Sequence, residues 1–593
     1  MANLVQPVAP LVPIEERTIE FKGLNRQAVV AEGEMPDMWN LTSDNYPLLT
    51  PRKPRGAMRL PAGVVKPMQL MAKFEKIAMI AATGSGVAFY YDGEKILDES
   101  TGLSEQTEMV AINTKICFFP EKTYVEVTSE GIVANSYKSL ESDVSVTGVT
   151  ITISSEDTRI TLPANHGFSY DDAIQITGEL SYTGTRSTTS CDVSCIIEDI
   201  VNTNTLVLPQ ATFLELIAAG VTTATLTGHV KRTMPKLDHV VEWNNRLWGC
   251  SNEDNTVYAS KLGDPKNWQY FQGTGIDSYY AQQGTDGEWT GIGLHSNHLV
   301  CFKQDSLCKI YGTAPSNYQV QNAEAFGVEL GSRKSVVTIN DTIFYKSKVG
   351  IMAYTGSVPV CISDKFNSAF TNVVAGTEKR KYYASINRKT GGYELMVFDV
   401  DKGVWHKEDT TRFRSCATVG DKLYYIEYDH EVLYCSENLK CSDYLPVGGE
   451  ADSAHVGIIN PLTPDEDAGD MEWMAIFGPF DEYIEEHKIY SKLALRIISN
   501  DKKENDICNE NLEPICNEFG EFFYLEKYLN VYISLDEGDW ELVEHYAQPI
   551  TQGEFIPIIP RRCDRYSIKV EGKGKYEIKS LTRRIRKGTF GRL

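Results

Sequence analysis

Apolar and polar residues alternate with a period of two through much of residues 236–445, in short runs separated by polar turns. One run covers residues 247–251, the next covers 257–260, and the unit then closes on the aromatic segment 268–271. A period of two with Val, Ile, Tyr and Phe is typical of half-buried antiparallel strands, and Asn, Asp and Gly suit the turns between them. The pattern therefore predicts β-hairpins.

The same unit recurs at intervals of roughly 35 to 50 residues, which is typical of β-propeller blades. A blade cannot bury its faces alone and must stack against other blades around an axis. We expect about seven blades, and an irregular stack of β-meanders remains the alternative. Further copies of the unit lie at 77–91, 107–133, 298–311, 342–354, 393–406 and 422–434.

Changes in composition predict an all-β chain of several domains, since 593 residues exceed what a single core holds. The first 60 residues contain seven prolines and little periodicity, whereas the stretch from 143 is rich in Thr, Ser, Val and Ile, with one short helix expected at 213–219. Longer alternating strands follow residue 446. The predicted domains are an extended N-terminal arm (1–60), the first propeller blades (61–142), an inserted small β-barrel or sandwich (143–232), the remaining blades (233–445) and a C-terminal jelly-roll-like β-sandwich with a basic tail (446–593).

The charge is unevenly distributed along the chain, whose formal net charge is −23. Residues 143–230 hold ten acids against two arginines, whereas residues 561–593 hold twelve basic residues against three acids. The net acidity disfavours general DNA binding but would let a duplex slide through a carboxylate-lined tube. Two basic clusters either dock onto an acidic partner ring or are solvated. They consist of Arg52, Lys53 and Arg55 near the start, and Arg583, Arg584, Arg586 and Lys587 near the end.

Motifs for catalysis and for cofactor binding are weak, so we expect no enzyme, no cofactor and no metal site. The 13 cysteines are dispersed, as buried thiols in a reducing compartment are. Residues 399–403 and 465–470 resemble calcium loops but lack ligands that such loops need, which favours a hairpin turn and a solvated loop. His295 and His298 do not have convincing metal spacing, and His406 is expected to be packed or at a rim. We find no signal-peptide core and no apolar run of about 18 residues, so we expect no membrane-spanning segment.

Several short motifs resemble bacteriophage tail nozzle proteins, the group that includes tail tubular protein B and the tail-hub or stabilisation proteins of short-tailed phages. The motifs are 243–249, continuing through 257–260 to 262–268, together with 350–356, 40–47 and 558–564. The resemblance implies a propeller-based virion subunit, assembled in the bacterial host cytoplasm, that forms a hexameric tube below the portal and adaptor rings. That tube retains packaged DNA and later conducts it outward without binding it specifically. The acidic insert would suit a lumen wall or a gate.

A carbohydrate-interacting propeller is the alternative function, either as a receptor-binding tail protein or as a glycan-cleaving enzyme. Exposed aromatic side chains on blade loops bind sugars in such proteins, and the chain has 31 tyrosines. The missing catalytic motifs and the asymmetry of charge favour the structural role.

Overall fold

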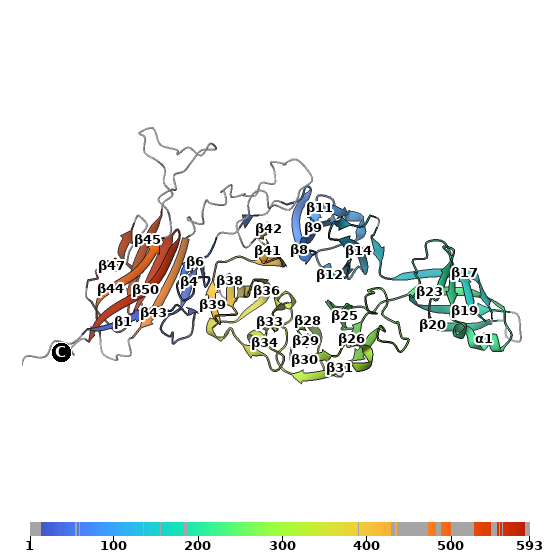
Figure 1. Cartoon of the computed structure of the whole chain (residues 1–593). Coiled ribbons are helices and arrows are strands. Elements are labelled where there is room, and N and C mark those ends of the chain that lie inside the picture. Colours follow the sequence, from blue (N-terminus) through green and yellow to red (C-terminus); the bar gives the residue numbers. More distant parts are fainter. Residues whose placement is uncertain are drawn as a thin grey trace, which may run out of the picture. The chain divides into compact units, whose positions relative to one another are not determined.

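The computed structural model describes residues 13–587 except 54–55, 58–59, 135, 155, 183–187, 390, 429–432, 436–471, 482–487, 500–526, 547–553, 557 and 560 (Figure 1). The chain is an all-β protein built on a β-propeller, as the alternation predicted. It divides into two compact units, residues 63–360 and residues 1–62 with 361–593. None of the described helices is long and apolar enough to cross a membrane.

The first unit holds five antiparallel blade sheets. Their strands follow chain order, except that the fifth strand of the second blade, β16, pairs with β14. Strands deep in the blades are buried on both faces; in β25, for example, all six residues are buried. The blades consist of β8–β11 (Val64–Lys73, Lys76–Thr83, Val87–Tyr91, Glu94–Leu97), β12–β16 (Glu108–Ile112, Lys115–Phe119, Thr123–Thr128, Gly131–Ile132, Lys138–Ser139), β24–β27 (His239–Trp243, Arg246–Ser251, Thr256–Ala259, Tyr279–Gln282), β28–β31 (Trp289–His295, His298–Lys303, Ser306–Tyr311, Gln319–Glu324) and β32–β35 (Val337–Ile339, Thr342–Ser347, Gly350–Tyr354, Val360–Cys361).

Two further blades belong to the second unit, which brings the blade sheets among the described residues to seven. The last of them takes its fourth strand, β7, from the N-terminal segment, because β7 pairs antiparallel with β42. β7 thereby completes the blade and covers the edge that β42 would otherwise expose. These blades are β36–β39 (Phe370–Glu378, Lys381–Arg388, Gly392–Asp399, Val404–Lys407) and β40–β42 (Phe413–Val419, Lys422–Glu427, Leu433–Cys435) with β7 (Gly56–Ala57).

The insert is one seven-stranded antiparallel sheet in the order β20-β19-β23-β17-β18-β22-β21, curled around a single apolar core. Residues from its strands and from the short helix α1 (Leu214–Ala218), which the sequence predicted, meet in that core. The strands are β17 (Ser142–Ile153), β18 (Thr158–Thr161), β19 (Ala173–Ser181), β20 (Thr188–Ile196), β21 (Asp199–Val201), β22 (Thr205–Leu208) and β23 (Thr223–Arg232).

Two glycines let β19 and β23 approach each other closely. Gly178 and Gly228 are directly paired, and a Cβ on Gly228 would lie 2.0 Å from the Thr177 carbonyl oxygen. We therefore expect Gly228→Ala to destabilise the insert by roughly 1–3 kcal/mol, because the backbone must shift to admit the methyl group. Thermal melting with limited proteolysis of the insert measures this. Gly284→Ala is the control, since a Cβ there meets nothing within 4 Å; equal effects in the two variants would contradict the argument.

The C-terminal β-sandwich consists of two five-stranded sheets. Alternate residues of the long strands are buried, among them Leu493, Val531 and Ile568. The N-terminal segment supplies a strand to each sheet: Ile14–Thr18 pairs with β50, and Asp37–Trp39 pairs with β43. These parts of the predicted extended arm therefore belong to the sandwich. The sheets are β1 (Ile14–Thr18), β50 (Tyr576–Lys587), β44 (Lys488–Ser499), β47 (Glu554–Ile556) and β48 (Arg561–Cys563), and β4 (Asp37–Trp39), β43 (Glu472–Phe480), β49 (Tyr566–Lys573), β45 (Tyr528–Leu535) and β46 (Glu541–Tyr546).

The N-terminal segment also forms four very short strands. β2 (Gly23–Leu24) pairs with β3 (Glu34–Met35), and β5 (Leu41–Thr42) pairs with β6 (Thr50–Pro51). Of the two acidic turns, residues 399–403 join β38 to β39 as a hairpin turn, with Lys402 Nζ 2.9 Å from Asp399 Oδ2. Residues 465–470 lie outside the described residues.

Candidate functional site: the junction between the insert and the third blade

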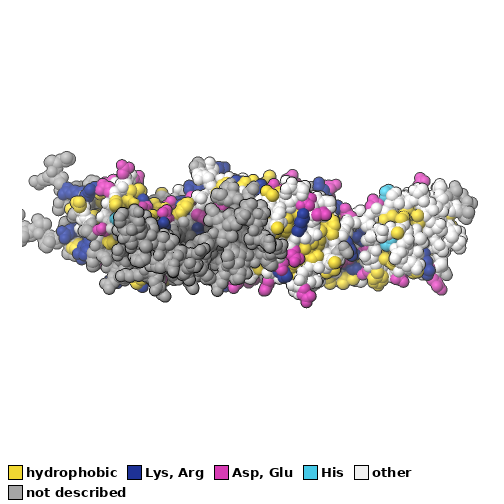
Figure 2. Space-filling model, turned by 90° about the horizontal axis from the view of Figure 1, so that it is seen from above, with side chains coloured by type: hydrophobic (Ala, Val, Ile, Leu, Met, Phe, Trp, Pro, Cys, Tyr) yellow, Lys and Arg dark blue, Asp and Glu magenta, His cyan; other side chains and the backbone are white. Residues whose placement is uncertain are grey.

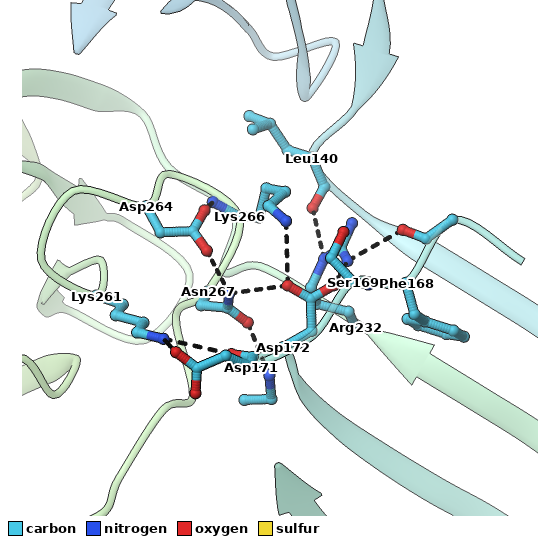
Figure 3. A network of polar contacts seen from close by, with 12 residues as sticks. Leu140, Phe168, Ser169, Asp171, Asp172, Arg232, Lys261, Asp264, Lys266 and Asn267 are labelled. Carbon is cyan, nitrogen blue, oxygen red and sulfur yellow. Dashed lines mark hydrogen bonds and ion pairs between the residues drawn. The ribbon is translucent and has the colours of Figure 1, made fainter. Parts of the chain in front are cut away.

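The loop between β26 and β27 carries the motif 262–268 on which the resemblance to nozzle proteins partly rests. Asp264 Oδ1 accepts a hydrogen bond from the Lys266 amide at 3.0 Å, and Trp268 Nε1 donates to the Pro265 carbonyl at 2.8 Å. Trp268 is buried in the core shared by the second and third blades. This turn fixes Lys266 and Asn267 in front of the insert (Figure 3).

Asp172 is the centre of the junction and is 1% exposed. Its carboxylate forms an ion pair with Arg232 Nη1 and accepts hydrogen bonds from Lys266 Nζ at 3.1 Å, from Asn267 Nδ2 at 3.1 Å and from the Ser169 amide at 2.7 Å (Figure 3). Such a buried carboxylate is tolerated only when its oxygens are paired in this way. The three side-chain donors come from the insert and from the blade loop, so this one residue joins the two.

Arg232 and Asn267 extend the junction to the backbone. Arg232, 2% exposed, also donates to the carbonyls of Leu140 at 3.3 Å and Gly167 at 3.2 Å. Asn267 accepts from the Ala173 amide at 2.8 Å. The backbone of the insert is therefore hydrogen-bonded directly to a side chain of the blade.

A second contact, in which only the Asp171 side chain is partly exposed, lies beside the first. Asp171 pairs with Lys261 and accepts from the Tyr270 hydroxyl at 2.9 Å, and Lys261 Nζ lies 3.7 Å from the centre of the Tyr270 ring. Burial, and then the hydrogen bond to Asp171, raise the pKa of Tyr270 to about 12. The tyrosine therefore stays protonated and keeps donating at neutral pH.

The junction has a structural role, which is to hold the insert against the third blade. Its charged groups are saturated by one another, and across the described chain no three His, Cys, Asp or Glu side chains are grouped to hold a metal ion. Sequence reasoning missed Asp172, Arg232 and Asn267, although the motif around Asn267 had been singled out. That motif was the only available signal, because Asp172 and Asn267 are 95 positions apart.

The first basic cluster lies beside the sixth blade. The Arg52 side chain donates from Nε to Asn40 Oδ1 at 2.9 Å and from Nη2 to Asp409 Oδ2 at 3.1 Å, so it is engaged within the subunit. Lys53 is exposed, and Arg55 lies outside the described residues. Docking through this cluster stays a prediction for Lys53 and Arg55.

The second cluster is split by the alternation of β50. Arg583 is fully buried, with its guanidinium 2.8 Å from Glu32 Oε2 and 3.8 Å from the centre of the Phe480 ring. The docking role predicted for Arg583 is therefore wrong, because the side chain points into the sandwich. Arg584 and Arg586 point the other way, Arg584 being paired with Glu15 at 3.0 Å and Arg586 being exposed. The side chain of Lys587 is not among those that the structure describes.

His295 and His298 face each other across the β28–β29 hairpin with ring centres 4.5 Å apart. His298 is 1% exposed, and its Nε2 lies 2.7 Å from the Tyr354 hydroxyl. Burial, and then the neighbouring His295 and Lys309, lower the pKa of His298 to about 4. His406 is likewise buried, and burial lowers its pKa to about 3.

Acid is therefore expected to weaken the fourth blade. The folded-state pKa of His298 lies below its unfolded value of about 6.5. The contribution of neutral His298 to the free energy of unfolding is therefore complete above pH 6.5 and is lost as the pH falls toward 4. At pH 5 the loss is about 2 kcal/mol. Hydrogen exchange of the β29 amides, corrected for intrinsic rates, measures it. His298→Gln should flatten the dependence of this protection on pH, whereas substitution of the exposed His545 by Gln should not. If the pH dependence were unchanged in His298→Gln, His298 would not be the source of the acid sensitivity.

No family model matches the chain, and no curated protein matches it. Among solved structures it is similar to Hsv2 of Kluyveromyces lactis, with 8% identity, TM-score 0.25, and coverage of 58% of this chain and 97% of that one. It is also similar to AztD of Citrobacter koseri, with 9% identity, TM-score 0.27, and coverage of 63% and 86%. A third is the phage phi92 endosialidase, with 10% identity, TM-score 0.22, and coverage of 72% and 78%. Similarities this weak carry no argument about function.

Proposed function

We propose that this chain is a structural subunit of a bacteriophage tail nozzle, which assembles into a ring of about six copies and acts without chemistry of its own. The observation that carries the proposal is the buried joint at Asp172. Polar groups of the insert and of the third blade hold the insert in a fixed position on that blade. A domain that projects from a ring subunit and must keep its position requires such a contact. The receiving loop is also the segment whose sequence resembles nozzle proteins.

The second unit supports the same interpretation. Three ion pairs join the N-terminal segment to the sixth blade and to the segment just before it. Arg26 lies 2.8 Å from Glu394 and Lys407 lies 2.6 Å from Asp37, while Lys365, which precedes the blade, lies 2.7 Å from Glu34. With strands β1 and β4 in the sandwich and β7 in the seventh blade, this segment connects the propeller to the sandwich in several places. A subunit that retains packaged DNA under pressure needs such connections between its domains.

In this proposal the rings lie below the portal and adaptor rings of a virion, and double-stranded DNA passes through the lumen between subunits. The net charge of −23 supports passage without adhesion, because carboxylates repel phosphates. Mass photometry and negative-stain microscopy of the purified chain, alone and with virion extract, test the proposal. Rings of about six subunits with a central hole are expected; a chain that stays monomeric and never joins a virion particle would overturn it.

One observation favours the carbohydrate alternative. Tyr280 and Phe271, on the outer strand and adjoining loop of the third blade, are 60% and 50% exposed with their rings 5.9 Å apart. Exposed aromatic faces of this kind can stack on sugar rings. A glycan array comparing the wild type with Phe271→Ala/Tyr280→Ala tests this; a sugar bound by the wild type and lost in the variant would support the alternative.

A further inference from the structure

The outer face of the sheet that contains β50 and β44 is strongly basic. Residues paired across antiparallel strands point to the same side, and the buried pairs Leu493 with Arg583 and Leu495 with Leu581 mark the inner face. The intervening positions form the outer face, where six basic residues accompany the acids Glu15 and Glu577. We call these six the basic face: Arg17, Lys492, Arg496, Arg562, Arg584 and Arg586.

Much of this charge is uncompensated. Four arginines of this face are compared: Arg496, Arg562, Arg584 and Arg586. Of these, Arg584 forms an ion pair within the described chain, with exposed Glu15 at 3.0 Å. The other three of these arginines are exposed, and no carboxylate of the described chain lies within ion-pair distance of them. Figure 2 shows Lys and Arg side chains gathered over the sandwich, at the left end of the view. Uncompensated like charges on a flat sheet attract a surface of opposite sign.

The insert presents such a surface. Its exposed acids greatly outnumber its exposed basic residues in the described ranges, where Arg159 is the exposed arginine. Three of these acids are Asp143 on β17, Glu179 on β19 and Asp192 on β20, within the four consecutive strands β20-β19-β23-β17 of the insert sheet. The exposed acids are Asp143, Glu156, Glu179, Asp192, Glu198, Asp199 and Glu215.

We propose that the basic face docks the acidic insert of a second copy of this chain. The inference rests on the proposed function, and it names the contact that propagates the ring. A contact between two different surfaces of identical subunits is head-to-tail, and such contacts close into rings when the rotation between subunits permits. The local complementarity between this face and the acidic side of the insert favours a second copy as the occupant of the face.

A charge-swap experiment on the full chain tests this. The face variant carries Arg562→Glu, Arg584→Glu and Arg586→Glu, and the insert variant carries Asp143→Lys, Glu179→Lys and Asp192→Lys. Each variant alone should self-associate at least about 100-fold more weakly than the wild type, because like charges then meet across the contact. A 1:1 mixture should recover association, since each insert then meets a face of opposite sign. Analytical ultracentrifugation with two fluorescent labels measures both results, and the wild-type association should weaken with salt.

The control variant Lys138→Glu, Lys348→Glu and Lys389→Glu makes the same change of net charge at exposed lysines on other sheets and should associate like the wild type. Melting curves of the variants confirm that they fold. Wild-type rings that persist in the face variant would overturn the inference but leave the proposed function standing. A wild type that forms no rings would overturn the proposed function. The 1:1 mixture of the face and insert variants still tests the contact itself, and a mixture that does not associate would overturn the inference. Loss of binding to a duplex oligonucleotide with association unchanged would also overturn it, by assigning the face to phosphates.

Discussion

Replacing Arg583 by alanine is expected to lower the free energy of unfolding of the sandwich by roughly 1.5–3 kcal/mol, because a buried guanidinium is lost together with its hydrogen bonds to the partly exposed carboxylate of Glu32. Arg583 is 0% exposed. Its guanidinium donates to Glu32 Oε1 at 3.0 Å, to Glu32 Oε2 at 2.8 Å and to Thr18 Oγ1 at 2.8 Å. Removing it takes away those bonds and the contact of its guanidinium with the Phe480 ring. Urea denaturation followed by hydrogen exchange of the β1 and β50 amides measures the change.

Arg586→Ala is the matched control on the same strand. Arg586 is exposed, so the free energy of unfolding should change by no more than about 0.5 kcal/mol. Both substitutions remove one positive charge, so a difference between them reports burial. If both variants lost equal stability, the lost charge would explain the effect and the burial of Arg583 would not.

This contrast also shows where sequence reasoning reached its limit. Residues 583–587 were treated as one basic cluster, but a strand alternates its side chains between two faces, so Arg583 and Arg584 have opposite environments. Leu581 and Ile585, two positions before and after Arg583, mark the inward-facing side of this strand in the sequence. An arginine at an inward position was not expected there, because buried arginines are rare and need a partner that only the fold supplies. Its partner, Glu32, is 551 positions away.

The propeller was predictable for the opposite reason. Each blade is local in sequence, and strands such as β29 and β30 are joined by a tight polar turn, so periodicity and turn residues suffice. The contributions of the N-terminal segment were not predictable. β7 has two residues and β4 has three, which is too short for a period to appear. Their pairing partners lie hundreds of residues later, and pairing over such separations leaves no pattern in one sequence.

The junction of the insert gives the second large effect. Asp172→Asn preserves the shape of the side chain but leaves Arg232 and Lys266 without their buried carboxylate, and the new amide brings a donor among donors. We expect the joint to open locally, because breaking a buried pair costs about 3–5 kcal/mol. The amide of Ala173, which donates to Asn267 at 2.8 Å, reports this directly. Its protection from hydrogen exchange should fall by roughly 100-fold or more.

Asp171→Asn is the comparison, because Asp171 is adjacent and paired with Lys261 but its side chain is 35% exposed. Water can replace part of that interaction, so the expected loss is about 1 kcal/mol or less. The larger effect at Asp172 should extend to assembly: an insert that moves freely on the blade presents its acidic surface to a neighbouring copy less often, which lowers the effective concentration of the contact. If Asp172→Asn kept both the Ala173 protection and the wild-type association, the joint would be dispensable and the rigid-projection argument for a nozzle would fail.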